Sequence, residues 1–205
     1  MSAARSVTLD VPDPAVAEAF HKAAFGPDIP VAVRAGDAPT SGFRGYTLSV
    51  VVPGPSGVDA IVASALDAGA TVVKPVAKSF WGYGGVVQAP DGAIWTVASS
   101  SKKDTGPATA AVVESVVLLL GVADVKAAKQ FYIDRGLVVA RSFGSKYVEF
   151  TAADGAPVTL ALQGRRALAK NAGVDPDGTG SHRLVIVGDA GSFTDPDGFV
   201  WETSA

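Results

Sequence analysis

The sequence predicts an α+β protein in which strands and helices alternate in two related halves of the chain. A turn followed by a strand occurs at residues 88–96 and again at residues 194–202. Both copies place Pro, Asp and Gly in successive turn positions and a Trp at the same position of the strand that follows. Because one copy ends each half, the chain is predicted to repeat one structural plan.

A second repeat opens each half with a strand and a capped helix. A strand over residues 7–11 precedes a helix that Asp13 is expected to cap and Gly26 to end. A strand over 116–122 precedes a second helix, which Asp124 is expected to cap. Both copies therefore predict the order strand, helix, glycine, strand.

The remaining elements follow from the spacing of apolar residues. Ser56 and Asp59 are expected to form a capping box at the start of a helix that ends near Gly69. A short helix is expected to begin at Arg165 and end near Gly173. Further strands are predicted over residues 46–52, 71–73, 84–88, 146–150, 158–162 and 182–187. The last unit of the chain has no segment that suits a helix.

Composition limits the classes of function. The 205 residues are 48% hydrophobic, enough to bury a core, and carry a net charge of −3 with a pI near 5.3. No basic stripe is present, so nucleic-acid binding is not expected. No apolar run approaches the roughly 20 residues of a membrane span. The absence of cysteine and of a secretory pattern at the N-terminus favours a cytoplasmic protein.

A Ser-, Lys-, Gly- and Pro-rich stretch divides the chain. The predicted organisation is a first module over 1–100, a linker over 101–111 and a second module over 112–205. Both modules lack parts of the repeated plan, which leaves sheet edges that a second copy can cover. A homodimer is therefore expected.

Three motifs carry a resemblance to a known family. Residues 122–137 combine Val-Ala-Asp, then Phe-Tyr, then Gly-Leu; residues 79–85 alternate aromatics with Gly; and residues 195–202 form the closing hairpin Asp-Pro-Asp-Gly-Phe-Val-Trp-Glu. Together they resemble the glyoxalase, bleomycin-resistance and extradiol dioxygenase (vicinal oxygen chelate) superfamily. The resemblance implies tandem, shortened βαβββ modules that form cupped mixed sheets.

The resemblance also implies a divalent metal such as Zn, Ni, Mn or Fe, held by His, Gln or Glu side chains on the first and last strands of paired units. His182 and Glu202 match two ligand positions, whereas Val117 and Ala161 stand at two others. The metal site is thus expected to be incomplete, and no cofactor is certain. Without metal, His182 and Glu202 can instead form an acid–base couple, or they are an edge histidine and a solvated carboxylate.

Other residues are candidates for ligand contact. Phe80, Trp81 and Tyr83 are interleaved with glycines, so a flat ligand can stack there. Tyr147 and Glu149 share one face of a predicted strand. The repeated Trp95 and Trp201 are expected to lie in the core, whereas His21, which follows Phe20 where the family often has Tyr, is expected on the helix surface.

The resemblance implies a glyoxalase-like protein that acts on or binds a small organic molecule, with a lyase or isomerase as the expected type of enzyme. The alternative is a metal-free protein that binds and sequesters a drug or metabolite, as bleomycin-resistance members of the superfamily do. A non-catalytic interaction module is a third possibility. An extradiol dioxygenase is disfavoured, because its iron needs two His and one Glu and Val117 stands where a His is required.

Overall fold

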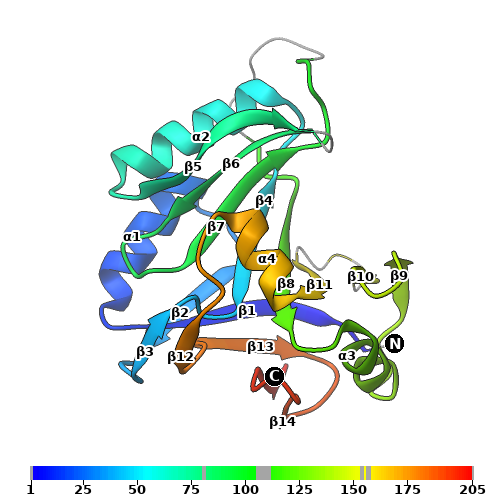
Figure 1. Ribbon diagram of the computed structural model, residues 1–205. Helices are drawn as coiled ribbons and strands as arrows, with labels where there is room; N and C mark the ends of the chain where they lie inside the picture. Colours follow the sequence, from blue (N-terminus) through cyan, green and yellow to red (C-terminus); the bar gives the residue numbers. More distant parts are fainter. Residues whose placement is uncertain (1, 80–81, 105–111, 153–154, 156–157, 205) are drawn as a thin grey trace.

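The computed structural model describes residues 2–79, 82–104, 112–152, 155 and 158–204. Within these residues the chain forms four helices and fifteen strands in three sheets. This is the mixed α+β class that the sequence predicts, and Figure 1 shows the helices packed around the sheets. None of the helices in the described part of the chain is long and apolar enough to cross a membrane.

The elements follow one another as four units, and the first two units make up the first half of the chain. The first unit contains β1 (Ala4–Val11), α1 (Pro14–Phe25), β2 (Val31–Ala35) and β3 (Thr40–Gly42). The second unit contains β4 (Tyr46–Val51), α2 (Pro55–Asp67), β5 (Thr71–Ser79), β6 (Gly82–Gln88) and β7 (Ile94–Ser99).

The second half contains the third and fourth units. The third unit contains β8 (Ser115–Val122), α3 (Val125–Ile133), β9 (Val139–Ser142), β10 (Tyr147–Phe150) and β11 (Val158–Gly164), and α4 (Arg165–Ala172) follows it. After β12 (Gly178–Gly180), the fourth unit contains β13 (Leu184–Gly188), β14 (Phe193–Thr194) and β15 (Val200–Thr203). As predicted, the described residues of the fourth unit contain no helix.

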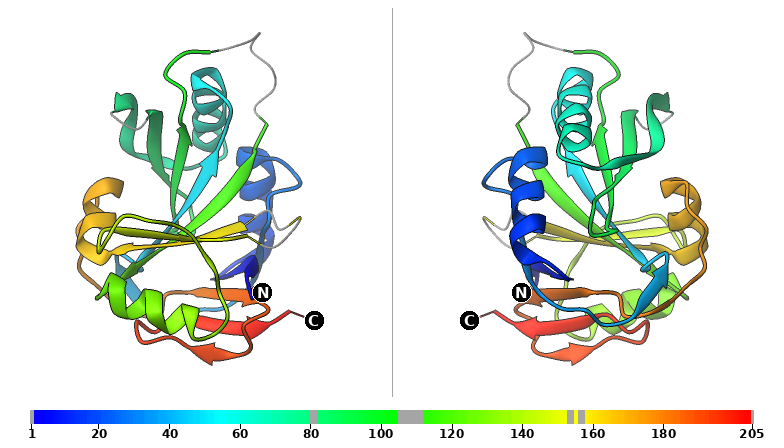
Figure 2. Two further views of the ribbon diagram at one scale, coloured as in Figure 1. Left: turned by 90° about the vertical axis from the view of Figure 1, so that its right-hand side faces the viewer. Right: turned by 90° about the vertical axis from the view of Figure 1, so that its left-hand side faces the viewer.

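Each large sheet combines strands from both halves of the chain. The eight-stranded sheet has the order β5-β6-β7-β4-β8-β11-β10-β9, so the second and third units share it. The five-stranded sheet has the order β14-β15-β13-β1-β2, so the fourth unit completes the first. Figure 2 shows β1, in blue, beside the orange and red strands of the fourth unit at the bottom of the molecule.

This pairing differs from the expectation that each half curls a sheet of its own. The first and fourth units contribute few strands each, and the antiparallel pair of β1 and β13 satisfies main-chain groups that either unit alone would leave at an edge. The sheets therefore do not follow a division of the chain at residues 101–111, and that division stays a prediction.

Two of the predicted helix starts are confirmed in atomic detail. The Asp13 carboxylate accepts a hydrogen bond from the Val16 main-chain N–H at 3.1 Å, and Pro14 is the first helical residue. The Asp124 carboxylate accepts from Lys126 and Ala127 N–H groups at 2.8 and 3.1 Å. An acceptor at this position satisfies main-chain donors that the first helical turn leaves unpaired.

The predicted capping box at the second helix is wrong. Gly54 is the N-cap of α2 and offers no side-chain cap, and the main-chain N–H and the hydroxyl of Ser56 both donate to the Asp104 carboxylate. Asp59 instead accepts a hydrogen bond from Tyr83. A distant carboxylate thus replaces the local one that the sequence pattern suggested.

The largest core cluster joins α1, α2 and α3 to one face of each large sheet, whereas α4 packs in two smaller clusters on the other face of the eight-stranded sheet. The side chains of Trp95 and Trp201 are 0% and 1% exposed, which confirms that both are core residues. His21 is also buried, so the prediction of a surface histidine is wrong. The buried face of α1 includes His21 together with Phe20 and Ala24, whereas Val16 points outward.

Candidate ligand site on the eight-stranded sheet

One face of the eight-stranded sheet is buried beneath α1, α2 and α3. The other face, called the open face below, is covered in part by α4, which packs against Leu119, Val86 and Ile94. Leu48 on β4 and Trp95 on β7 are fully buried beneath the helices. Their neighbours Ser49 and Thr96 point the other way, pair with each other across the two strands and are only partly buried. Strand alternation extends this open face across the sheet, where Val117 on β8 pairs with Ser49.

A groove of about 490 Å³ lies at the second-unit end of this open face. Its floor includes Gly84, Thr96 and Ala98. Lys74 and Lys78 on β5 bring positive charge to its side. The Lys74 ammonium donates to the main-chain oxygen of Asn171 at 2.9 Å and so connects β5 with the end of α4. The groove thus combines a small-residue floor with cationic walls.

Tyr83 lies at the margin of this groove but directs its hydroxyl elsewhere. The hydroxyl donates to the Asp59 carboxylate on α2 at 2.9 Å, and this hydrogen bond is the main cause that raises the pKa of Tyr83. The ring therefore packs against the main core on the helix-covered face, and its polar end is held by α2. Phe80 and Trp81, which were grouped with Tyr83 as ligand contacts, lie outside the described residues.

Tyr147 and Glu149 lie on β10, in the third-unit part of the same sheet. They share a face, as expected, and the Tyr147 hydroxyl donates to the Glu149 carboxylate at 2.8 Å. Glu149 is paired with Ala161 on β11, whose other neighbour is Leu119 on the open face. Burial, and secondarily the bond to Glu149, raises the pKa of Tyr147 far above its ordinary value, so the phenol stays protonated.

His182 does not open a strand as the sequence predicted. Strand β13 begins two residues later, and Arg183 between them has a φ of 51°, which breaks the alternation that would place His182 beside Leu184. The ring lies stacked on Phe199 with centroids 4.0 Å apart. Sequence alternation failed here because a single left-handed residue reverses the direction of the side chain before it.

Both ring nitrogens of His182 contact main-chain oxygens. Nδ1 lies 2.5 Å from the oxygen of Arg44, and Nε2 lies 3.0 Å from the oxygen of Asp197. Gly45 makes room for this contact, since a Cβ there would lie 3.2 Å from the imidazole. His182 thus connects the loop before β4 to the closing turn of the fourth unit.

Glu202 lies on β15, in the other large sheet, and has different partners. Its carboxylate accepts a hydrogen bond from the Arg34 guanidinium at 3.1 Å, and the same guanidinium donates to Asp10 at 2.5 Å. These side chains are partly exposed, and such surface ion pairs contribute little to stability. His182 and Glu202 are therefore engaged by separate groups rather than by each other.

The donors present do not fit a divalent metal. A catalytic zinc or iron site needs three protein ligands around one point. The described residues contain no group of three or more His, Cys, Asp or Glu side chains with such an arrangement. His182 is turned toward two main-chain oxygens, and the Glu202 carboxylate is neutralised by Arg34.

Comparison with solved structures identifies the fold. The chain matches glyoxalase I from Zea mays with a TM-score of 0.64 and 13% identity, over 99% of this chain and 92% of that one. A single-residue variant of the same maize enzyme matches with a TM-score of 0.63 and 12% identity, over 98% of this chain and 93% of that one. This chain has the glyoxalase-type, or vicinal oxygen chelate, fold.

That fold was expected from the repeated strand, helix and hairpin, and the expectation is confirmed at the level of structure. No protein-family model and no curated protein matches the sequence. Identities this low establish how the chain folds and carry no activity with them. Within the glyoxalase-type fold, the eight-stranded sheet is the more complete, and it carries the groove described above.

Proposed function

We propose that this protein binds a small organic molecule in the groove on the open face of its eight-stranded sheet, without a metal held by the protein. The groove of about 490 Å³ is the observation that carries this proposal. Its size falls in the range of small-molecule sites, and Gly84, Thr96 and Ala98 form a floor with little side-chain bulk. Lys74 and Lys78 favour a ligand with a negative charge.

A flat aromatic acid fits this description best. The shallow floor accepts a planar ring, and the lysine ammonium groups attract a carboxylate or phenolate. Such a protein would sequester its ligand, as the bleomycin-resistance type of protein does. This is the metal-free alternative that the sequence left open.

The lyase or isomerase alternative has less support from the geometry. It relied on His182 and Glu202 acting together, either on a metal or as an acid–base couple. The two residues instead contact Arg44 and Asp197 on one side and Arg34 on the other. Metal-free binding therefore accounts for more of the observed contacts.

The test is a thermal-shift and calorimetric screen with aromatic carboxylates and phenols. A ligand that binds only the folded state raises Tm by mass action. Ala98→Leu, which fills the groove, should abolish the shift. Ala32→Leu makes the same change on the five-stranded sheet and should leave the shift intact, because Ala32 pairs with Thr8 on the other sheet.

Metal analysis completes the test. Protein purified without chelator should hold far less than one equivalent of Zn, Ni, Mn or Fe, and His182→Ala should not change that content. A stoichiometric metal that disappears in His182→Ala would show that the binding proposal is wrong in its metal-free form. Ligand shifts that survive Ala98→Leu would show that the groove is not the site.

A further inference from the structure

A second groove of about 300 Å³ lies where β4 and β7 begin. It has no lining residue in common with the groove on the open face. Phe43, Ile94 and Val174 supply apolar walls, and polar side chains that include Arg44, Tyr46 and Gln88 also line it. The volume is that of a small-ligand site.

Tyr46 offers this groove a buried hydroxyl. The residue is 1% exposed, and its hydroxyl has no hydrogen-bond partner among the described residues. Burial is the main cause that raises the pKa of Tyr46 to about 12, so the hydroxyl keeps its proton at neutral pH. A buried hydroxyl of this kind is costly unless something accepts its proton in a hydrogen bond.

Arg44 offers a second donor beside it. Its Nη2 donates to the main-chain oxygen of Asp91, which fixes the guanidinium, while Nη1 is buried without a partner among the described residues. The guanidinium lies near enough to Tyr46 for its charge to oppose the rise in the tyrosine's pKa, although no hydrogen bond of normal geometry joins the two side chains. The described residues form no salt bridge with Arg44.

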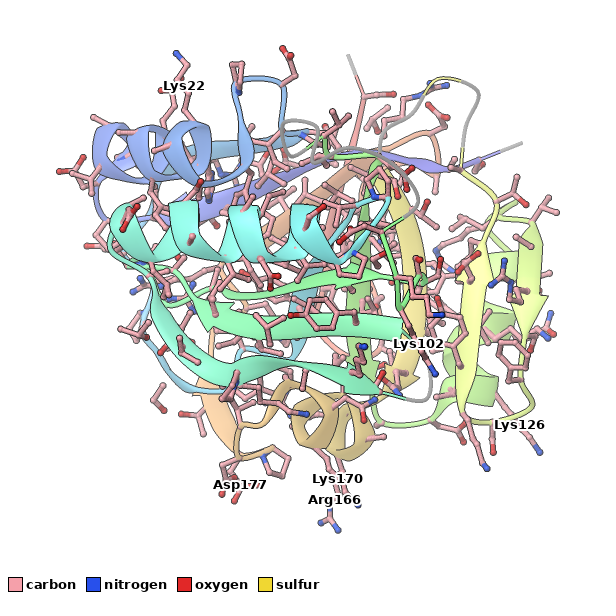
Figure 3. The ribbon with its side chains drawn as sticks, turned by 90° about the horizontal axis from the view of Figure 1, so that it is seen from above. Lys22, Lys102, Lys126, Arg166, Lys170 and Asp177 are labelled. Carbon is pink, nitrogen blue, oxygen red and sulfur yellow. The ribbon has the colours of Figure 1, made fainter. Side chains whose placement is uncertain are left out.

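The mouth of the groove carries the opposite charge. Asp175 and Asp177 line it and are exposed, and the Asp177 N–H donates to the Asp175 carboxylate at 2.8 Å, which shapes the loop. Figure 3 shows Asp177 at the outer surface, beside the end of α4. The Asp91 carboxylate also lies near Tyr46, since its charge helps to raise the tyrosine's pKa, and its Oδ2 is buried without a partner among the described residues. The inner end of the groove therefore combines the donors of Arg44 and Tyr46 with one buried carboxylate, and the mouth carries two exposed carboxylates.

We propose that this groove binds a small α-amino acid. The ligand carboxylate would accept hydrogen bonds from Arg44 and Tyr46, and its ammonium would face Asp175 and Asp177. An apolar side chain would contact Phe43, Ile94 and Val174.

The charge distribution selects this class of ligand. A guanidinium and a neutral hydroxyl together are suited to a carboxylate. A simple organic anion would also meet the Arg44 donor, but Asp175 and Asp177 repel net negative charge and attract an ammonium. A zwitterion satisfies both ends, and binding would supply the acceptors that Tyr46 and Arg44 lack within the described residues.

The experiment titrates the intact protein with each standard α-amino acid by calorimetry. The tightest binder is then compared with the amine that lacks its carboxylate and with the acid that lacks its ammonium. We expect saturable binding of at least one amino acid, no measurable binding of the amine, and binding of the acid weakened at least about tenfold.

Variants assign the binding to the groove. Tyr46→Phe and Arg44→Gln should each weaken binding at least about tenfold. Arg166→Gln removes a charge from the exposed side of α4, where Figure 3 shows the side chain pointing outward, and should leave affinity unchanged. Tyr46→Phe should not lower Tm, because it removes an unpartnered hydroxyl, so lost binding cannot be ascribed to unfolding.

Two results would overturn the proposal. One is the absence of saturable binding by any standard amino acid up to about 10 mM, a concentration above which affinity has little meaning. The other is an affinity that Tyr46→Phe and Arg44→Gln both leave unchanged. Neither result bears on the aromatic-acid groove, which shares no lining residue with this one.

Discussion

The two closing hairpins of the repeat have the same backbone plan and different polar chemistry. In the second hairpin, the Tyr132 hydroxyl donates to the Asp195 carboxylate at 2.6 Å, and the Trp201 indole N–H donates to the Tyr132 oxygen at 3.3 Å. All three residues are buried. The chain of bonds connects α3, the turn and the last strand into one unit.

The first hairpin contains the equivalent tryptophan but neither the tyrosine nor the aspartate of the polar chain. His21 stands eight residues after the capping aspartate of its helix, as Tyr132 does after its own, and Ala89 takes the place of Asp195. The His21 Nε2 and the Trp95 Nε1 atoms are buried without partners among the described residues, although their rings meet with centroids 5.4 Å apart. The same fold therefore forms with and without the polar chain.

The comparison shows which forces determine the shape of the hairpin. Turn residues and a buried tryptophan are common to both copies, so they are sufficient for the backbone. The polar chain adds stability to one copy and is not required for the geometry. In the first copy the polar atoms of His21 and Trp95 instead lower the stability, because they are buried without hydrogen-bond partners among the described residues.

The largest effect is expected from Asp195→Ala. The Asp195 carboxylate accepts hydrogen bonds from Tyr132, Asp197 and Phe199, and its removal leaves buried donors unpaired. We expect a loss of about 3 kcal/mol in the free energy of unfolding, measured by urea denaturation. Asp175→Ala removes an exposed turn carboxylate and should cost well under about 1 kcal/mol. Equal losses of stability in the two variants would show that the hydrogen bonds of Asp195 do not stabilise the second hairpin.

The second prediction rebuilds the chain in the first hairpin. Ala89→Asp alone places a buried carboxylate without a partner and should destabilise the protein. His21→Tyr in the same molecule supplies the donor, as Tyr132 does for Asp195. A double-mutant cycle should give a favourable coupling of about 2 kcal/mol. If the two substitutions instead change the free energy of unfolding additively, the first hairpin cannot form the hydrogen bond found in the second.

A smaller effect is expected from paired phenylalanine substitutions. Tyr132→Phe removes the bonds to Asp195 and Trp201 and should cost about 1–2 kcal/mol. His21→Phe removes an unpartnered nitrogen, keeps an aromatic ring against Trp95, and should be neutral or stabilising. Chemical denaturation of both variants at pH 8 measures the difference. A larger loss of stability in His21→Phe than in Tyr132→Phe would contradict the conclusion that only the second hairpin is stabilised by these hydrogen bonds.

The smallest effect is a pH dependence that belongs to the first hairpin. Burial lowers the pKa of His21 in the folded protein, so the unfolded chain binds the proton more readily. Stability from this source is present above the ordinary histidine pKa of about 6.5 and falls as the pH drops below it. Urea denaturation at pH 8 and 5.5 should show this loss, and His21→Phe should reduce it. If His21→Phe leaves the pH dependence of stability unchanged, this dependence does not come from His21.

Local features of the fold were predictable from the sequence, because their causes are local. Asp13 and Asp124 cap helices through bonds to residues two or three positions away, and the closing turns depend on adjacent Pro, Asp and Gly residues. The sheet order was not predictable in the same way. The pairing of β1 with β13 joins segments that are far apart in the sequence, and no short sequence motif indicates such a pairing.

The candidate sites were predicted less well, and for a related reason. A left-handed Arg183 turned His182 away from the expected face, and Arg34 paired with Glu202 from another strand. Arg44 and Tyr46 were missed altogether, since only the fold shows that they are buried without partners. The His21 position did carry a signal, because the repeat aligns it with a tyrosine that the structure places in the core.

The five-stranded sheet has a consequence for how the protein is made. During synthesis β1 leaves the ribosome before the second and third units, whereas its antiparallel partner β13 leaves after them. Until those two units have been synthesised, β1 can pair only with β2, and sheets closed by such distant contacts form slowly. Once closed, the same sheet joins the first unit to the fourth, so a protein cut between the second and third units should remain one particle.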